Sequence, residues 1–149
     1  MTVFDKPEQR TEVEERLVTW IETHVGGTVT QLKRQGRWRP AWFADVKLPK
    51  EIKHLYVRGD RTSKMVVYPL AYECNVLQVL EANGIPVPHT YGLCPDPLAI
   101  VMDRAEGRAD LSTAESEAER NAVMDQYIDI LAKIHAIDPG KFEVVGLKR

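Results

Sequence analysis

One cation and one carboxylate are spaced so that together they could hold a phosphate group. Arg58 ends the run Leu55-Tyr56-Val57, which reads as a strand, and Glu73 lies in the helical segment that follows. A cation at the end of a buried strand is costly unless an anion meets it, so we expect the two side chains to pair. A guanidinium held in this way suits bidentate contact with phosphate oxygens. Spacing alone favours a structural salt bridge or a solvated strand end.

Two other segments could contact a nucleotide. The turn Gln35-Gly36-Arg37-Trp38-Arg39-Pro40 could offer backbone amides to phosphate, although any hairpin uses a glycine. We predict that Trp38 and Trp42 are packing residues. The strand Ile100-Val101-Met102-Asp103 continues into the polar stretch Arg104-Ala105-Glu106-Gly107. We expect backbone amide and carbonyl groups there to be available to an adenine edge.

Other chemistry has little support in the sequence. The four histidines, His24, His54, His89 and His135, share no metal-ligand spacing with each other or with a cysteine. His135 and Asp138 have the types of a catalytic dyad, but Pro139-Gly140 follows them, so we interpret them as helix-end residues. No Gly-x-Ser-x-Gly or Gly-x-x-x-x-Gly-Lys-Ser/Thr motif occurs. We therefore predict no metal site.

The composition is that of one globular domain, or of one lobe of a larger protein. The 149 residues are 44% hydrophobic and 28% charged, with a net charge of -2. That balance gives no reason to expect a nucleic acid or a membrane as partner. Cys74 and Cys94 lie in apolar surroundings and read as buried thiols. With no signal-peptide core after Met1, we expect a cytoplasmic protein.

Caps, glycines and apolar periodicity predict the elements that must position these groups. A capping box at Thr11 and Glu14 begins a first helix, which Gly26-Gly27 ends. A second capping box, Ser112-Thr113-Ala114-Glu115, is expected to begin a long helix whose apolar face carries Val123, Tyr127, Ile130, Leu131 and Ile134. Between them we predict strands at 28–34, 41–48, 54–58, 89–94 and 98–103, and a helix from Pro69 to Gly84. This order indicates an α+β fold.

Several short segments, in this order, resemble the amino-terminal part of the aminoglycoside phosphotransferase family. They look most like the branch related to the kinase-like domains of some acyl-CoA dehydrogenases. The matching segments are Gly36-Arg37-Trp38-Arg39-Pro40-Ala41-Trp42, Leu55-Tyr56-Val57-Arg58, Glu73-x-x-Val76-Leu77, Gly84-Ile85-Pro86-Val87-Pro88, Tyr91-Gly92, Ile100-Val101-Met102-Asp103-Arg104 and Leu131-Ala132-x-x-His135.

The resemblance implies a protein-kinase-like small lobe, with an antiparallel sheet of about five strands plus helices, at 1–106. Residues 107–149 would be a linker and the first helix of a large lobe. By position, Arg58 replaces the usual phosphate-contacting lysine, Glu73 is its helix partner and Gly36 lies in the loop that covers the phosphates. Val101, Met102, Asp103 and Arg104 match the linker that meets the base. In the complete protein, ATP or GTP with magnesium would phosphorylate a small-molecule hydroxyl.

The chain has no His-x-Asp-x-x-x-x-Asn loop, so the resemblance assigns it no catalytic residue. We expect the chain alone to be inactive and to bind nucleotide weakly, because phosphoryl transfer needs the positioning aspartate and the metal ligands. An alternative is a non-enzymatic kinase-like interaction module that forms a homo-oligomer through residues 117–136. A third possibility is an α+β domain with an unrelated ligand.

Overall fold

The computed structural model describes residues 10–60, 68–143 and 146, and its elements follow the predicted order. The bounds are α1 Glu12–His24, β1 Thr28–Arg34, β2 Ala41–Lys47, β3 Ile52–Gly59, α2 Leu70–Ala82, β4 Thr90–Pro95, β5 Leu98–Asp103, η2 Leu111–Thr113, α3 Glu117–His135 and α4 Gly140–Glu143. The predicted α+β architecture is confirmed, and strand β1 has the predicted bounds.

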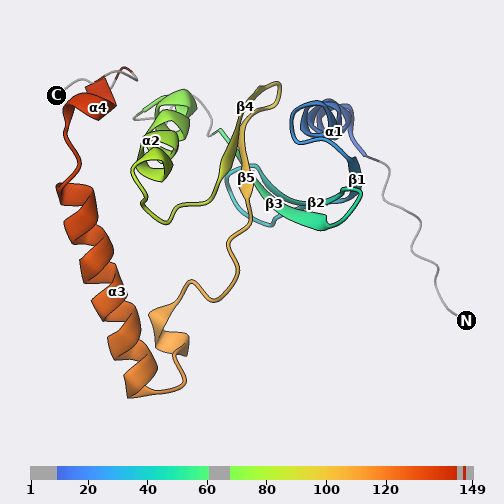
Figure 1. Cartoon of the computed structure of the whole chain (residues 1–149). Coiled ribbons are helices and arrows are strands. Elements are labelled where there is room, and N and C mark those ends of the chain that lie inside the picture. The colour runs from blue at the N-terminus through green and yellow to red at the C-terminus, as the bar shows by residue number, and fades with distance from the viewer. Residues whose placement is uncertain (1–9, 61–67, 144–145, 147–149) are drawn as a thin grey trace, which may run out of the picture.

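The five strands form one antiparallel sheet in the order β1-β2-β3-β5-β4. Helices α1 and α2 pack against the sheet, as Figure 1 shows. Successive side chains of a strand point to opposite faces, and the core is divided accordingly. Leu55 and Val57 pack in a cluster with α1, whereas Tyr56 packs with Ile100 in a second cluster with α2. This arrangement is consistent with the predicted kinase-like small lobe.

Helix α1 begins and ends as the sequence predicts. The Thr11 hydroxyl accepts a hydrogen bond from the Glu14 amide, and the Glu14 carboxylate accepts one from the Thr11 amide. At the other end, Gly27 has a φ of +73°, and a Cβ there would lie 2.4 Å from the carbonyl oxygen of Lys47. Leu17 and Ile21 are fully buried against the sheet. Local caps and long-range burial therefore specify the same helix.

Helix α3 begins later than predicted, so the expected capping box at residues 112–115 is wrong. The Asp110 carboxylate accepts a hydrogen bond from the Ser112 amide, and residues 111–113 form the short helix η2. Ser116 is the N-cap instead and accepts from the Glu119 amide. The side chain of Glu119 then accepts from the amide of Glu115. Ser112 lies outside α3 because its amide is hydrogen-bonded in an Asx turn with Asp110.

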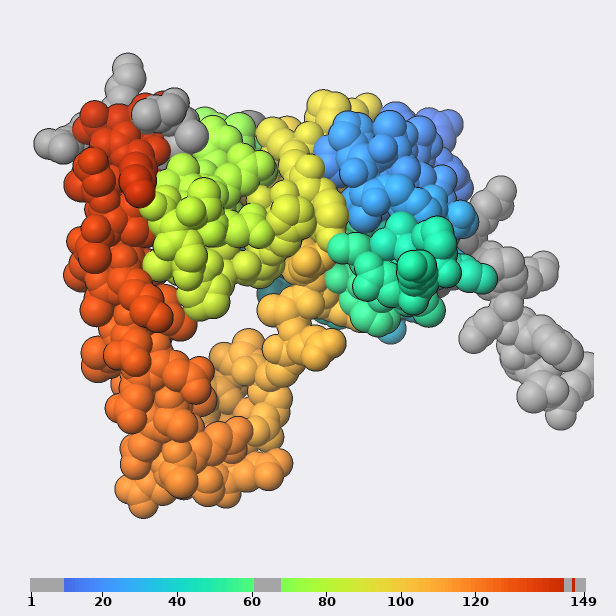
Figure 2. Space-filling view, viewed as in Figure 1, coloured from blue at the N-terminus to red at the C-terminus, as the bar shows by residue number. Residues whose placement is uncertain are grey.

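No residue of α3 is buried. In Figure 2 the linker and most of α3 project away from the body that contains the sheet. The predicted apolar face exists, but Val123, Tyr127 and Leu131 are 43%, 61% and 39% exposed. Among the helices within the described ranges, none combines the length and the apolar character needed to cross a bilayer.

Candidate functional site

Arg58 and Glu73 form the ion pair that their spacing suggests. Arg58 is the penultimate residue of β3, opposite Ala41 on one side and Ile100 on the other. Glu73 lies in the first turn of α2, and one of its carboxylate oxygens contacts a terminal nitrogen of the guanidinium. The two side chains are 24% and 39% exposed. The pair is thus partly shielded from solvent.

The sheet face that carries Arg58 also carries two aromatic rings. Phe43 and Tyr56 are directly opposite each other on β2 and β3 and contact edge to face, with ring centroids 5.9 Å apart. The guanidinium of Arg104 lies 4.8 Å from the centroid of the Phe43 ring. Arg58, the two rings and Arg104 therefore follow one another along a single face. Strand alternation could have identified Phe43 and Tyr56, which the sequence interpretation did not include.

A small network of charges continues this face beyond the rings. Asp45 lies opposite His54, and its carboxylate contacts the Nδ1 atom of that histidine at 2.7 Å. A guanidinium nitrogen of Arg104 lies 3.6 Å from the same carboxylate. Asp45 thereby holds Arg104 in place over Phe43. Asp45 and His54 are further residues of the site that the sequence interpretation missed.

The four predicted linker residues divide between the two faces of the sheet. Val101 is fully buried in the cluster with α1, so its side chain cannot meet a ligand. Met102, 6% exposed, packs on the other face with α2. Asp103 accepts a 2.7 Å hydrogen bond from the hydroxyl of Tyr91, a residue that packs against the α1 cluster. Met102 and Arg104 share the face that carries Arg58, and of these two only Arg104 is not buried.

Tyr91 connects Asp103 to a lysine on the α1 side of the sheet. The Lys53 ammonium donates to the Tyr91 hydroxyl at 2.8 Å, and this hydrogen bond raises the pKa of Lys53. Burial raises the pKa of Tyr91, so the phenol stays protonated between the ammonium and the carboxylate. This chain of hydrogen bonds fixes the end of β5.

The expectation that the backbone groups of this linker are available is wrong for two amides. The Asp103 amide donates to the His89 carbonyl, and the Arg104 amide donates to the His54 carbonyl, each at 2.9 Å. The reason is that the end of β5 stays bonded to the chain on both of its sides. A base edge would therefore have to use groups beyond Arg104.

The turn with Gly36 lies at the same end of the sheet as Arg58, because Ala41 follows the turn and pairs with Arg58. No heavy atom lies within 4 Å of a Cβ built on Gly36, so the turn is open. The amides of Gln35 and Arg37 are used inside the turn. Trp42 is 2% exposed, as predicted for a packing residue, but Trp38 is 68% exposed and is not part of the core.

His24 and His135 lie at helix ends, and the two cysteines lie in the core. The Nδ1 atom of His24 contacts the Trp20 carbonyl at the end of α1, and His135 lies in the last turn of α3. Asp138 accepts from the Gly140 amide, so its carboxylate caps α4 and forms no dyad. Cys74 and Cys94 are buried, and burial raises the pKa of both thiols. Within the described part of the chain, no three His, Cys, Asp or Glu residues could hold a metal ion.

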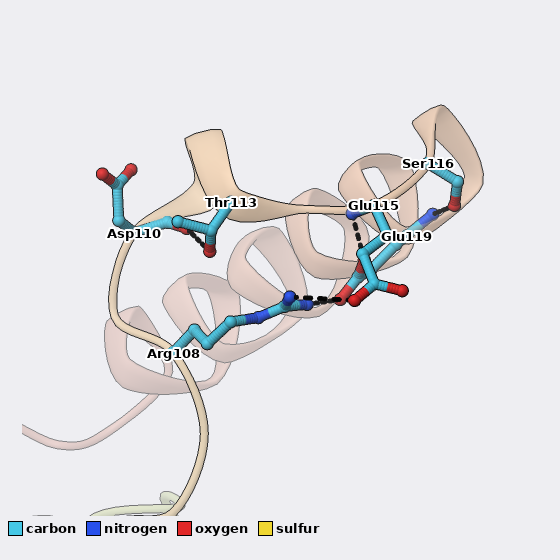
Figure 3. Close-up of polar contacts among 6 residues, drawn as sticks. All are labelled: Arg108, Asp110, Thr113, Glu115, Ser116 and Glu119. Atoms are coloured by element: carbon cyan, nitrogen blue, oxygen red, sulfur yellow. Dashed lines mark hydrogen bonds and ion pairs between the residues drawn. The ribbon is translucent and has the colours of Figure 1, made fainter.

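A second polar cluster, in the linker, is structural. The Arg108 guanidinium contacts Glu119 at 2.7 Å and Glu115 at 3.3 Å, as Figure 3 shows. A hydrogen bond from the Glu115 amide, with Arg108 nearby, lowers the pKa of Glu119. An open cavity of about 300 Å³ lies between residues 107–114 and α3. Because these charges satisfy one another, the cluster ties the linker to the start of α3.

Comparison with known proteins identifies a family. Residues 56–147 match the phosphotransferase enzyme family. Neither the curated proteins nor the solved structures contain a match. The matched segment includes the end of β3 with Arg58, α2 with Glu73, both later strands and α3, and it is well over half of the chain. The chain therefore belongs to the phosphotransferase enzyme family.

Proposed function

We propose that this chain forms the nucleotide-binding small lobe of a phosphotransferase that moves the γ-phosphate of a nucleoside triphosphate to a small-molecule hydroxyl. The proposal rests chiefly on the ion pair between Arg58 of β3 and Glu73 of α2. Family membership supports the phosphotransferase class. The nucleotide, the resemblance to the acyl-CoA-dehydrogenase-related branch and the assignment to the small lobe are our inferences.

The Arg58–Glu73 pair supports phosphate binding through its geometry. A guanidinium has five N–H donors in a planar fork, and one carboxylate accepts at most two of them. The ion pair therefore fixes the orientation of the guanidinium on this face of the sheet. Arginine at this position would contact two phosphate oxygens at once, which a lysine ammonium does not do in the same planar way.

The rest of the face that carries Arg58 supports a place for the base. A nucleotide with its phosphates at Arg58 and near Gly36 would extend along the sheet over Tyr56 and Phe43. An aromatic surface suits a purine ring. Arg104, held by Asp45, would then border the base. Base-edge hydrogen bonds would come from the linker after Arg104, because the amides of Asp103 and Arg104 are already used.

The chemical step requires groups that we do not find among the described residues. Phosphoryl transfer depends on magnesium, on positioning of the acceptor hydroxyl and on electrostatic stabilisation of the transferred group. We propose that the magnesium ligands, the positioning aspartate and the acceptor pocket come from outside these 149 residues. Residues 1–106 would then be the small lobe and 107–149 the linker and first large-lobe helix. Buried thiols at Cys74 and Cys94 favour a reducing, cytoplasmic location.

Nucleotide titration of the purified chain tests this proposal. We expect weak, saturable binding of Mg-ATP or Mg-GTP by calorimetry, with the two nucleotides compared directly. Arg58→Ala should weaken it at least tenfold, and Glu73→Gln should weaken it less, because the guanidinium stays but loses its orientation. Arg16→Ala is the matched control: it removes the Arg16–Asp96 ion pair, 2.9 Å long, which joins α1 to the β4–β5 turn on the side of the sheet opposite the face that carries Arg58. A thermal melt checks that each variant folds.

Two results would contradict the proposal. Binding that is unchanged in Arg58→Ala would remove the phosphate site from this face. Measurable phosphoryl transfer by the purified chain would show that the catalytic groups lie within it.

The exposed apolar side chains of α3 favour a second candidate function, a kinase-like module that acts by binding protein rather than by catalysis. Self-association or partner binding without any nucleotide affinity would favour this alternative.

A further inference from the structure

The sheet face that carries Arg58 is arranged in three successive levels, because alternate strand residues point to the same face. Arg58 stands in the first level. Tyr56 and Phe43 lie opposite each other in the second. Asp45, two residues beyond Phe43 on β2, belongs to the third level, where Arg104 contacts it. The third level lies four strand residues from the first, which is about 13 Å. A cation and a charged cluster therefore stand at opposite ends of an aromatic surface.

The third level has hydrogen-bonding capacity that the described residues leave unused. The Nδ1 atom of His54 and a guanidinium nitrogen of Arg104 both contact the Oδ1 atom of Asp45, at 2.7 and 3.6 Å. Within residues 10–60, 68–143 and 146, the Oδ2 atom of Asp45 accepts no hydrogen bond and the Arg104 guanidinium donates none. Both side chains reach solvent, at 23% and 31% exposure. The cluster can thus offer a carboxylate oxygen and several N–H donors to a ligand.

The position of Arg104 decides where a base could lie. Its guanidinium lies over the Phe43 ring, 4.8 Å from the centroid, so the cation takes up that face of the ring. A base bound on this face of the sheet would lie over the neighbouring ring of Tyr56, which is half-buried. The edge of such a base would face Arg104 and Asp45 in the third level.

We propose that Arg104 and Asp45 select guanine, so that GTP rather than ATP is the nucleotide of this site; the inference rests on the nucleotide function proposed above. A guanidinium can only donate hydrogen bonds, and an ionised carboxylate can only accept them. Guanine presents two acceptors, N7 and O6, followed along the same edge by two donors, N1–H and the N2 amino group. Arg104 would donate to N7 and O6, and the Asp45 carboxylate would accept from the two donors.

Adenine does not match this pair of side chains. Its N6 amino group is a donor at the place where guanine has O6, so it would face the donors of Arg104. Its N1 atom carries no hydrogen and would turn a lone pair toward the Asp45 carboxylate. Loss of one good bidentate contact corresponds to about a tenfold difference in affinity or more.

Calorimetric titration of the full chain with Mg-GTP and Mg-ATP tests this preference. We expect GTP to bind about tenfold more tightly than ATP. Arg104→Ala should bring the ratio close to one by weakening GTP, whereas Arg58→Ala should weaken both nucleotides alike. Arg34→Ala is the matched control, because it removes a guanidinium that lies 5.0 Å from the Trp42 ring centroid on the α1 side of the sheet. It should leave the ratio unchanged.

Base analogues assign the two contacts separately. The analogue 7-deaza-GTP lacks the N7 acceptor, and ITP lacks the N2 amino group, so the wild-type chain should bind both more weakly than GTP. In Arg104→Ala, 7-deaza-GTP and GTP should bind equally well. In Asp45→Asn, ITP and GTP should bind equally well. Each comparison uses two ligands on one variant, so a change in stability does not mimic the result.

A thermal melt checks that the variants fold, and Arg104→Lys is a second, milder variant. It keeps the positive charge but loses the planar fork, so it should also lower the ratio of GTP to ATP affinity. Equal or tighter binding of ATP by the wild-type chain would overturn the guanine inference alone. A preference for GTP that survives in both Arg104 variants would do the same. Absence of binding by either nucleotide would overturn this inference together with the proposed function.

Discussion

Strand β3 and helix α3 are specified in opposite ways. In β3, Leu55 and Val57 are fully buried, and the strand is hydrogen-bonded to a neighbour on each side. In α3 no residue is buried, and its defined features are an N-cap at Ser116 and a salt-bridge cluster around Arg108. The strand is held by residues that are distant in the sequence, whereas the helix is specified by its neighbours. Contacts between residues distant in sequence are therefore concentrated around β3, the strand that carries Arg58 of the Arg58–Glu73 ion pair.

This difference has a functional meaning. A site for a charged ligand needs rigid support, and the Arg58–Glu73 pair joins a central strand to a helix packed on it. A surface for another helix needs only exposed apolar side chains in the right order, which α3 provides. The two candidate functions therefore rest on different regions and can fail separately.

Truncation of a buried side chain should show the difference between β3 and α3 most strongly. Leu55→Ala leaves a cavity in the centre of the sheet and should lower the free energy of unfolding by about 2–5 kcal/mol. Leu131→Ala, the same change on the exposed helix, should lower it by no more than about 0.5 kcal/mol at concentrations where the chain is monomeric. Urea denaturation measures both. Equal losses would mean that α3 packs as tightly as the sheet does.

Removal of a helix cap should have a smaller effect on stability. The measured property that changes should differ between α1 and α3. Thr11→Ala removes the cap of α1, a helix with a buried face, so it should lower global stability by about 1 kcal/mol. Ser116→Ala removes the cap of α3 and should reduce helix content by circular dichroism while the urea midpoint barely moves. If Ser116→Ala shifted the midpoint as far as Thr11→Ala, then α3 would be coupled to the core.

The smallest expected effect is a dependence of stability on pH at Glu14. Burial tends to raise the pKa of Glu14, but hydrogen bonds from Thr11 and from the Trp42 indole, with Arg34 nearby, lower it below the ordinary value of 4.5. The native state therefore favours the carboxylate. Its contribution to stability is complete above pH 4.5 and is lost as the pH falls through the lower native pKa.

Glu14→Gln should flatten this part of the pH profile, measured as the urea midpoint between pH 6 and pH 3. Glu119→Gln is the comparison in α3, where hydrogen bonding also lowers the pKa of an exposed carboxyl group. It should alter helix content and leave the urea midpoint unchanged. A midpoint that falls equally steeply in wild type and Glu14→Gln would contradict the account of Glu14.

Local signals in the sequence predicted a large part of this fold. Strand β1 was recognisable between Gly27 and the turn at Gly36, and the Arg58–Glu73 pair followed from the cost of an unpaired cation. The start of α3 was not recognisable, because Ser112 and Ser116 each precede a glutamate by three residues. The hydrogen bond from the Ser112 amide to Asp110 removes Ser112 as a candidate N-cap, so Ser116 caps α3.

The site was harder to predict, because it depends on which strands are neighbours. The amides of Asp103 and Arg104 are occupied by carbonyls of His89 and His54, which are distant in sequence. Phe43 became a site residue only because β2 pairs with β3 in a register that places Tyr56 opposite it. Val101 and Met102 lie on opposite faces of the sheet because successive strand residues alternate. The sequence interpretation treated residues 101–104 as one linker and did not separate the two faces.

The most direct test of the account is a map of amide and arginine side-chain resonances in the labelled chain during titration with Mg-ATP and Mg-GTP. We predict saturable shifts at the Arg58 Nε–H, at the amides around Gly36 and in the linker after Arg104, with α1 unchanged. Arg58→Ala should abolish the shifts near Gly36. Shifts confined to α1, or no shift at millimolar nucleotide, would contradict the claim that the Arg58–Glu73 pair receives a triphosphate.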